Sequence, residues 1–516
     1  MSFKSIRKSF FILTGATILC RIFGLFREIA TANYFGTTGI YDSFLLAFMI
    51  PNFFRGLLAE GALSTAFIPV LTEYLTDPEK KGEVKKISSK VFTFFLVSTI
   101  TLYVIFIVLS FSVVHSHLFS PKVDEIFELL KFTFPYLIFV SLAAWCMGIL
   151  NSYNHFLVPG LSPVIFDGWW ILSLFVFVPF FKTFDAKIYG LIIGVILGGI
   201  GQFLFQFPKV VKYQGFPKLD FDWGHPALKK MLFLFTPIII GVSVGPINLL
   251  VDYSFANFLK PGMVSALWYA TRIYQLPLGV FSVSMATILL PQLSKDAIKK
   301  NVHLVRENME HGVSQIFFLM IPSSIWLALY RNSLITLFFK HGAFNGYSVQ
   351  ITAFALLFFS LGIVFYGAAM VLTNTFYAFN DTRTPVKIGL ISIATNAVLD
   401  YVLMQFLSQG GIALSTSFVG LENFLFLGYI LNKKFNIFSW KYITKSFLRI
   451  LAVSLLWGIL LWLVKRFFNL GPDKNIIIGL VLGFLLYIGL SFILKLPEAE
   501  GWKKRGNRDD KIRESM

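Results

Sequence analysis

Long apolar stretches, separated by short polar segments, run through almost the whole chain. About 14 of them are long enough to cross a bilayer as helices of roughly 20 residues. The first begins with basic residues, as a signal peptide does, but it has no small-residue cleavage site and so predicts a retained helix. The pattern predicts an all-α integral membrane protein with about 14 transmembrane helices. The stretches lie near residues 9–33, 40–72, 88–113, 126–150, 161–181, 188–208, 231–258, 264–292, 311–330, 348–378, 386–407, 412–432, 447–466 and 475–495.

An internal repeat is visible at an offset of about 223 residues. About six predicted helices separate equivalent points, so both copies have the same orientation in the membrane. This predicts two six-helix lobes related by a pseudo-twofold axis along the membrane normal, with a transport site between them. We expect an N-lobe at 1–218, a C-lobe at 219–436, two further helices at 437–498 and a basic tail at 499–516. The paired motifs are Glu28 to Tyr34 with Asp252 to Phe258, Ile68 to Thr72 with Leu290 to Ser294, Asn151 to Tyr153 with Asn374 to Phe376, and Ser162 to Val164 with Thr384 to Val386.

The composition excludes a soluble enzyme. The 516 residues are 56% hydrophobic and 14% charged, whereas soluble domains carry about 25% charged residues. The net charge of +18 comes mostly from Lys and Arg in alternate loops, and the positive-inside rule then places both termini in the cytoplasm. These basic loops are dispersed, so they do not support nucleic-acid binding. Cys20 and Cys146 both lie in apolar stretches, which excludes a disulfide scaffold or a zinc module.

Four arginines lie inside the apolar stretches: Arg21, Arg27, Arg55 and Arg272. An arginine at the bilayer centre costs roughly 2.5–3.5 kcal/mol unless it faces water or an ion partner. A guanidinium binds phosphate oxygens through a planar fork, so the choice of arginine over lysine favours an anionic phosphate-containing substrate. The alternative is that these arginines only hold helices together by pairing with Glu28, Asp42 and Glu60.

A second polar set combines Asp252, Asn396, Asp400 and Thr416. Asn396 and Asp400 are four residues apart, which places them on one face of a helix. Carboxylate, amide and hydroxyl oxygens suit a hard monovalent cation such as Na+, or a proton on a buried carboxyl. The alternative is a group of hydrogen-bonded acids that joins helices, and the residue pattern leaves both open.

The residue types needed for catalysis are missing from the predicted membrane interior. All seven histidines fall in loops or at helix ends. There is no HExxH motif, no P-loop and no Ser/His/Asp arrangement within the membrane. We therefore expect a transporter with no catalytic residue and no cofactor, coupled to Na+ or H+.

Several motifs with polar residues lie within or beside the apolar stretches, and the polar run from Pro51 to Gly61 is unusual inside a membrane. The motifs are Arg21-Ile22-Phe23-Gly24-Leu25-Phe26-Arg27-Glu28, Tyr41-Asp42-Ser43-Phe44, Pro51-Asn52-Phe53-Phe54-Arg55, Ala59-Glu60-Gly61-Ala62-Leu63-Ser64, Tyr269-Ala270-Thr271-Arg272, Pro277-Leu278-Gly279-Val280 and Thr384-Pro385-Val386-Lys387. Together they resemble the MurJ (MviN) family of lipid II flippases, in the MOP transporter superfamily, and the run from Pro51 to Gly61 makes the resemblance specific.

The resemblance implies a monomeric protein of the bacterial cytoplasmic (inner) membrane, surrounded by phospholipid, that acts in peptidoglycan synthesis and so in cell shape. It would flip undecaprenyl-diphosphate-linked lipid II outward by alternating access, with cell-wall synthesis proteins as candidate partners. Residues 437–498 would form a groove for the polyprenyl tail. The implied substrate-binding residues are Arg21, Arg27, Arg55, Arg272, Asp42, Asn52, Glu60 and Ser265, and the implied sodium ligands are Asp252, Asn396, Asp400 and Thr416.

The resemblance is incomplete beside Arg272, where many members of the family carry acidic residues and this chain has Thr271 and Gln275. That departure puts in doubt a salt-bridge gate at this position. Alternatives in the superfamily are a MATE-like multidrug or cation antiporter, which needs an acidic, aromatic cavity, and an exporter of another polyprenyl-linked saccharide. A membrane glycosyltransferase or acyltransferase needs an acid–base residue in the membrane, and a scaffold without transport would make the arginines replaceable.

Overall fold

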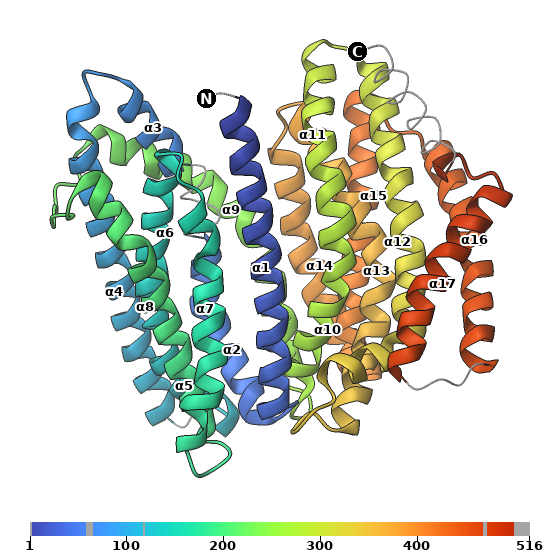
Figure 1. Cartoon of the computed structure of the whole chain (residues 1–516), viewed down its shortest axis with the longest axis horizontal. Coiled ribbons are helices and arrows are strands. Elements are labelled where there is room, and N and C mark those ends of the chain that lie inside the picture. Colours follow the sequence, from blue (N-terminus) through green and yellow to red (C-terminus); the bar gives the residue numbers. More distant parts are fainter. Residues whose placement is uncertain (1–2, 58–65, 117–118, 468–471, 500–516) are drawn as a thin grey trace. The chain divides into compact units, whose positions relative to one another are not determined.

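In the computed structural model, which describes residues 3–57, 66–116, 119–467 and 472–499, every regular element is helical (Figure 1). Each predicted apolar stretch overlaps a helix. The helices are α1 (Phe3–Phe35), α2 (Gly39–Arg55), α3 (Ile68–Thr76), α4 (Val84–Ser116), α5 (Pro121–Thr133), α6 (Tyr136–Ser152), α7 (Leu157–Val176), α8 (Lys187–Gln214), α9 (Pro226–Ala256), α10 (Met263–Pro277), α11 (Val283–Ile298), α12 (Val302–Phe339), α13 (Gly346–Ala378), α14 (Arg383–Leu407), α15 (Gln409–Phe435), α16 (Trp440–Phe467) and α17 (Pro472–Ile493). Short elements are η2 (Lys81–Glu83), η3 (Val178–Phe180) and the π-helical η4 (Leu278–Ser282).

Many of these helices are long and apolar enough to span a membrane. Among the described residues, nine helical segments meet this criterion, and α5 with α6, bent by 44° at their junction, makes a further candidate. The expectation of an all-helical protein with many membrane spans is therefore confirmed. By this criterion the described part of the chain supplies nine or ten of the about 14 spans that the apolar pattern predicts.

The chain divides into two compact units. Unit 1 comprises Met1–Ser254 and His341–Phe344, and unit 2 comprises Phe255–Lys340 and Asn345–Met516. The short segment 341–344 belongs to unit 1 because it packs on the end of α1, where the Ala343 N–H donates to the Asn33 carbonyl at 2.9 Å. The boundaries expected from the repeat stay a prediction.

Several helix ends follow local sequence signals. Asn301 and Asn345 cap α12 and α13, each accepting a hydrogen bond from the backbone N–H three residues later. Helix α8 ends at Gly215, whose φ of 73° lies in the region that favours glycine. Asn436, with φ of 54°, ends α15 in the same way. These residues position the loops that join the spans.

The core of unit 1 contains an aromatic ladder on α2. Tyr41, Phe44 and Phe48 share one helix face and stack with ring centroids 5.8–5.9 Å apart. Trp170 of α7 packs edge-on against both phenylalanines. Between α7 and α8, a side chain at Gly194 would overlap Ser173, so the small residue allows the two helices to approach closely.

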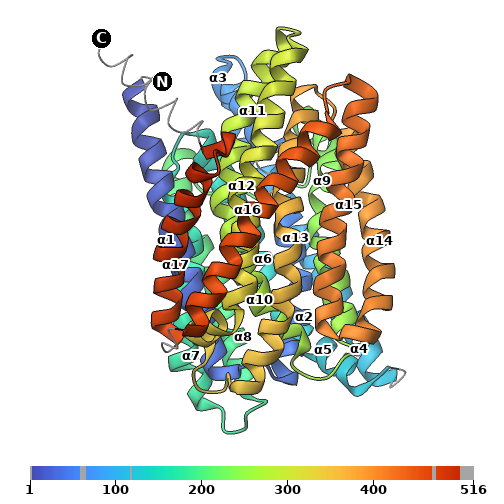
Figure 2. The ribbon, with the colours of Figure 1, turned by 90° about the vertical axis from the view of Figure 1, so that its right-hand side faces the viewer.

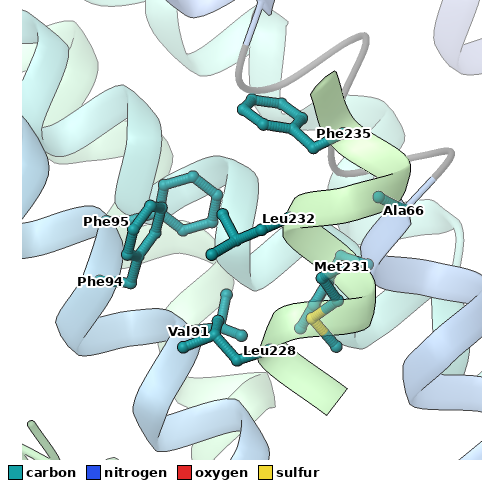
Figure 3. Close-up of a pocket in the computed structure, with 9 residues that line it drawn as sticks. Ala66, Val91, Phe94, Phe95, Leu228, Met231, Leu232 and Phe235 are labelled. Carbon is teal, nitrogen blue, oxygen red and sulfur yellow. The ribbon is translucent and has the colours of Figure 1, made fainter. Parts of the chain in front are cut away.

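Helices α4 and α9 also pack together in unit 1, through apolar side chains (Figure 3). Val91 and Phe95 of α4 lie opposite Leu228 and Leu232 of α9, around an apolar cavity of about 40 Å³. Polar atoms are almost absent from its walls, so the cavity is of the kind that stays free of water. The contact fixes the first turns of α9 on α4.

Unit 2 is built around α13, which packs along α12 and α15. A side chain at Gly362 would overlap Ser417, so α13 and α15 are in close contact there. Helices α16 and α17 pack against each other and against α12 (Figure 2). Trp457 of α16 donates to the Gly483 carbonyl at 2.7 Å, and the Tyr487 hydroxyl of α17 donates to the Phe318 carbonyl of α12 at 2.9 Å.

Candidate functional site

Arg27 on α1 is the centre of a buried ion-pair network in unit 1. One terminal nitrogen donates to Asp167 Oδ1 and the other to Glu28 Oε1, both at 2.7 Å. The guanidinium carbon also lies 4.9 Å from the centre of the Trp170 ring, within the range of a cation–π contact. Two buried carboxylates therefore compensate the Arg27 charge, and the pairing alternative raised by the sequence holds in part for this arginine.

The network is positioned by hydrogen bonds between α1 and α7. The Thr31 hydroxyl donates to the Arg27 carbonyl at 2.7 Å, and the Trp170 indole N–H donates to the Thr31 hydroxyl at 2.9 Å. Asp167 and Trp170 are three residues apart, so they share the face of α7 that meets α1. Each member of the network thus has its orientation set by another.

Arg21 is more exposed than Arg27, whereas Arg55 is half-buried, as Arg27 is. The Arg21 side chain is exposed and makes no ion pair with any residue that the structure describes. Arg55 lies at the end of α2, where its Nε donates to Asn52 Oδ1 at 2.8 Å. Helix rise places each arginine roughly 20–25 Å along its own helix from the turn that joins α1 and α2.

Of the two acidic residues predicted to lie near these arginines, Asp42 is among the described residues. Asp42 is fully buried in the first turn of α2, where the helix dipole favours a carboxylate. Glu60, and the motif from Ala59 to Ser64, lie outside the described residues.

Arg272 on α10 is held differently, in unit 2. Its guanidinium carbon lies 3.9 Å from the centre of the Trp268 ring, four residues earlier on the same helix face. Thr271 beside it is buried and Gln275 is exposed. Five residues after Arg272, Pro277 leads into the π-helical η4, an irregularity that often marks functional sites. Ser265 is fully buried, and its hydroxyl donates to the Gly262 carbonyl at 3.1 Å.

The predicted cation ligands fall in both units. Asp252 is buried on α9 in unit 1, whereas the other three lie on α14 and α15 in unit 2. Asn396 Nδ2 donates to Asp400 Oδ2 at 3.3 Å, and the Thr416 hydroxyl donates to the carbonyl of Ile412 at 3.2 Å. The structure therefore brings Asn396 and Asp400 together, and the full set stays a prediction.

The seam between α14 and α15 contains more polar groups than the predicted set. The Ser415 hydroxyl donates to Asn396 Oδ1 at 3.2 Å, and the Thr395 hydroxyl donates to Glu422 Oε1 at 3.0 Å. Within the described parts of the chain, no cluster of three or more His, Cys, Asp or Glu side chains is arranged to hold a metal ion. A cation at this seam would rely on amide, hydroxyl and backbone oxygens as well as carboxylates.

Comparison with known proteins decides the family. Residues 31–481 match the model of the family described as lipid II flippase MurJ. The chain belongs to the MurJ family. It is 33% identical over 440 residues to a probable lipid II flippase MurJ of Vibrio cholerae, covering 82% of each chain. It is 31% identical over 431 residues to the lipid II flippase MurJ of Burkholderia cenocepacia, covering 82% of this chain and 83% of that one.

Comparison with solved structures also identifies the MurJ fold. A solved lipid II flippase MurJ in an inward closed conformation superposes with a TM-score of 0.79 at 29% identity, covering 94% of this chain and 98% of that one. A multidrug resistance MATE transporter of the MOP superfamily superposes with a TM-score of 0.63 at 14% identity, covering 80% and 95% of the two chains, which shows a shared fold. The family is one of transporters, so this MurJ chain is not an enzyme.

The sequence alone gives no specific role to several residues of the site: Asp167 and Glu422 could join a polar network, but their spacing does not say with which partners, and Trp268 is not singled out. Asp167 is 140 residues from Arg27, so no local pattern could reveal the pair. Trp268 could have been found, because it is four residues before Arg272 and therefore on the same helix face. The partner of Glu422 is visible only in the structure, as its contact with Thr395.

Proposed function

We propose that this chain moves lipid II from the inner to the outer leaflet of the bacterial cytoplasmic membrane by alternating access. The observation that carries the proposal is the match to the MurJ family over residues 31–481. Lipid II is undecaprenyl-diphosphate linked to a disaccharide-pentapeptide, so its headgroup brings negative charge into a membrane protein. Buried and half-buried arginines are the groups best suited to receive a diphosphate.

The arginines would act by exchanging partners. Arg27 is held by two carboxylates, and a diphosphate that approaches can replace one of them. Arg21 is exposed and is in no ion pair with the described residues, so it can bind an anion without breaking one, whereas Arg55, whose Nε donates to Asn52 Oδ1, would exchange its present partners for the anion. In this proposal Arg272 also binds the diphosphate, while Asp42, Asn52, Glu60 and Ser265 make the surrounding polar surface.

Coupling to a cation is the second part of the proposal. A Na+ ion held by Asp252, Asn396, Asp400 and Thr416 would help return the empty carrier. An inward-negative membrane potential acts on such a charge with about 2.3 kcal/mol per 100 mV. Both termini would lie in the cytoplasm, and α16 and α17 would receive the polyprenyl tail.

The experiment is transbilayer movement of fluorescent lipid II in vesicles that contain the protein. We expect the wild type to move lipid II well above the protein-free rate. Arg27→Ala and Arg272→Ala should each slow it by at least about tenfold, equivalent to roughly 1.4 kcal/mol. Arg383→Ala is the matched control, because Arg383 is exposed at the start of α14, and it should keep the wild-type rate.

The outcomes separate the function from the site. No movement by the wild type would overturn the flippase proposal. Wild-type rates in both Arg27→Ala and Arg272→Ala would remove the arginines from substrate binding while leaving the function in place. A lipid with one phosphate in place of the diphosphate should move more slowly, because it offers fewer oxygens to the guanidinium groups.

A further inference from the structure

The segment between α8 and α9 lies on unit 1 as an extended strap, residues 216–223. It contains no helix or strand, yet it is fastened to α4 by its backbone. The Lys218 N–H donates to the Ser89 hydroxyl at 3.2 Å, and the Asp220 N–H donates to the Thr93 hydroxyl at 2.9 Å. The strap therefore has a fixed path across α4.

Lys90 is the main fastening of the strap. Its side chain is only 1% exposed, and its ammonium group donates to Asp220 Oδ1 at 2.8 Å, to Asp222 Oδ2 at 2.9 Å and to the Asp222 carbonyl at 2.7 Å. All three donors of the lysine are thereby used. Hydrogen bonds from Lys90 hold the pKa of Asp220 and of Asp222 below the usual range, so both carboxylates stay ionised at neutral pH.

The apolar side chains on either side of Asp220 face the other way. Side chains alternate along an extended backbone, so fixing Asp220 and Asp222 on Lys90 turns Leu219 and Phe221 outward, where they are 60% and 59% exposed. Two further aromatic side chains of the strap are partly supported by helices: Phe216, 68% exposed, meets Phe207 of α8 edge-on, and Trp223, 40% exposed, meets Phe94 of α4 edge-on. Four large apolar side chains in eight residues make an exposed apolar patch, which marks an interaction surface.

The position of the strap indicates what it meets. It follows the candidate membrane span that ends at Gln214 and crosses α4 near the start of the span Lys81–Ser116, so it lies at the end of the membrane-spanning region. Lysines lie before, within and after it in the chain. Lys212, Lys218 and Lys229 are exposed and are in no ion pair with the described residues. Aromatic side chains next to lysines at the end of membrane spans are typical of the boundary between headgroups and acyl chains.

We propose that the 216–223 strap is a membrane-surface anchor that inserts its apolar side chains among anionic phospholipid headgroups, and that Lys90 is the latch that orients it. The lysines within and beside the strap in the chain attract the anionic lipid, and the apolar side chains enter the interface. The anchor connects α8 to α9, whose first turns are packed on the same α4 (Figure 3). The latch therefore holds the strap between two fixed ends.

The test measures where the strap lies in vesicles. Phe221→Cys, in a Cys20→Ser, Cys146→Ala background that removes the free cysteines, carries an environment-sensitive fluorophore. The vesicles are phosphatidylcholine with or without phosphatidylglycerol. We expect the label to be quenched by headgroup-proximal spin-labelled lipid and protected several-fold from aqueous iodide, more strongly with phosphatidylglycerol. Glu79→Cys, exposed near the start of α4, is the matched control and should be open to iodide.

Equal iodide quenching at 221 and 79 in both kinds of vesicle would overturn the anchor, and would leave a protein partner as the occupant of this surface. Protection at 221 that does not increase with phosphatidylglycerol would overturn the preference for anionic lipid.

The latch is tested by Lys90→Met, which should raise iodide access at 221 several-fold. Lys81→Met, exposed in η2 just before α4, should leave it unchanged. Because Lys90 is buried, its replacement can impair folding. Asp222→Ala therefore tests the same latch from the exposed strap and should give a smaller increase. An unchanged label at 221 in Asp222→Ala and in a folded Lys90→Met variant would overturn the latch.

Discussion

Two polar seams cross the apolar helices of this protein, and they differ in the sign of the charge at their centre. The seam between α1 and α7 is built around Arg27, with Asp167 and Glu28 as its ion partners. The seam between α14 and α15 is built from Asp400 and Glu422 with amides and hydroxyls, and residues 388–432 contain no Lys or Arg. The first seam is suited to exchange a carboxylate for an anionic group, and the second to hold a cation or a proton.

The two seams reduce the free-energy cost of a charge within a membrane helix in different ways. An isolated charge in a membrane helix costs several kcal/mol. Around Arg27, opposite charges and a tryptophan ring reduce this cost. At the α14–α15 seam, hydrogen bonds from Asn396 and Thr395 reach the carboxylates, and a bound cation would reduce it further. The seams are therefore expected to fail in different ways when their central residue is removed.

Arg27→Ala should have the largest effect. Removing one partner of a buried ion pair costs about 3–5 kcal/mol, because Asp167 and Glu28 are left buried without their cation. We expect a large loss of thermal stability and failure to rescue a flippase-depleted bacterium. Arg21→Ala is the exposed arginine control and should change the free energy of unfolding by less than about 0.5 kcal/mol. If Arg27→Ala were as stable as Arg21→Ala, the Arg27 network would not hold α1 on α7.

Asp400→Asn should mainly alter coupling. The substitution keeps the volume and a hydrogen-bonding group next to Asn396, but it removes a negative charge that would bind a cation. We expect lipid II transport that no longer responds to the replacement of Na+ by K+ at a fixed membrane potential. Asp381→Asn, which makes the same change just before α14 and outside the predicted cation set, is the matched control and should keep the Na+ response. A wild-type Na+ response in Asp400→Asn would remove Asp400 from coupling.

Thr31→Val tests the neutral part of the Arg27 seam. It removes the hydroxyl that accepts from Trp170 and donates to the Arg27 carbonyl, and leaves a buried indole N–H without this acceptor. That should cost about 1–3 kcal/mol of stability, less than Arg27→Ala, with transport reduced only as far as Trp170 moves. Thr287→Val is a matched control, since Thr287 is exposed and its hydroxyl donates to the Val283 carbonyl of its own helix. The measurement is the midpoint temperature of thermal unfolding, which should be lower for Thr31→Val than for Thr287→Val. Equal midpoints would contradict a stabilising role for the Thr31 hydroxyl.

The sequence predicts the positions of the helices better than it predicts the contacts between them. Each apolar stretch predicted as a span overlaps a helix of the structure. The prediction works because burial in lipid requires long apolar runs. Arg27 stood out as a charge within such a run, but Asp167 is 140 residues away and its role depends on how α1 packs on α7. Lys90, near the start of the predicted span at 88–113, resembles in the sequence the basic residues of the neighbouring loops, although its side chain is almost fully buried. The sequence does not distinguish a buried lysine from an exposed one, because the burial of Lys90 depends on where the strap at 216–223 lies.

The smallest expected effect on stability comes from an ion pair outside the spans. Its contribution is a reference against which the charged groups of both seams can be compared. Asp381, before α14, accepts hydrogen bonds from Lys434 at 2.7 Å and from the Thr384 hydroxyl at 2.7 Å. Burial raises the pKa of Asp381, but the hydrogen bonds from Lys434 and Thr384 outweigh it and leave the pKa below the usual range. A lowered pKa stabilises the folded state above the unfolded pKa, which is about 3.9, and this stabilisation is lost as the pH falls through the folded value.

Lys434 is 47% exposed, so solvent screens the pair and its contribution should be less than about 1 kcal/mol. We expect Asp381→Asn to be slightly less stable than the wild type at neutral pH, and the difference to disappear as the pH falls below about 4. Thermal unfolding of both proteins across this pH range measures it. A difference that persists at the lowest pH would come from the shape of the loop and not from the charge. In that case the pair could not serve as a scale for the charged seam around Arg27.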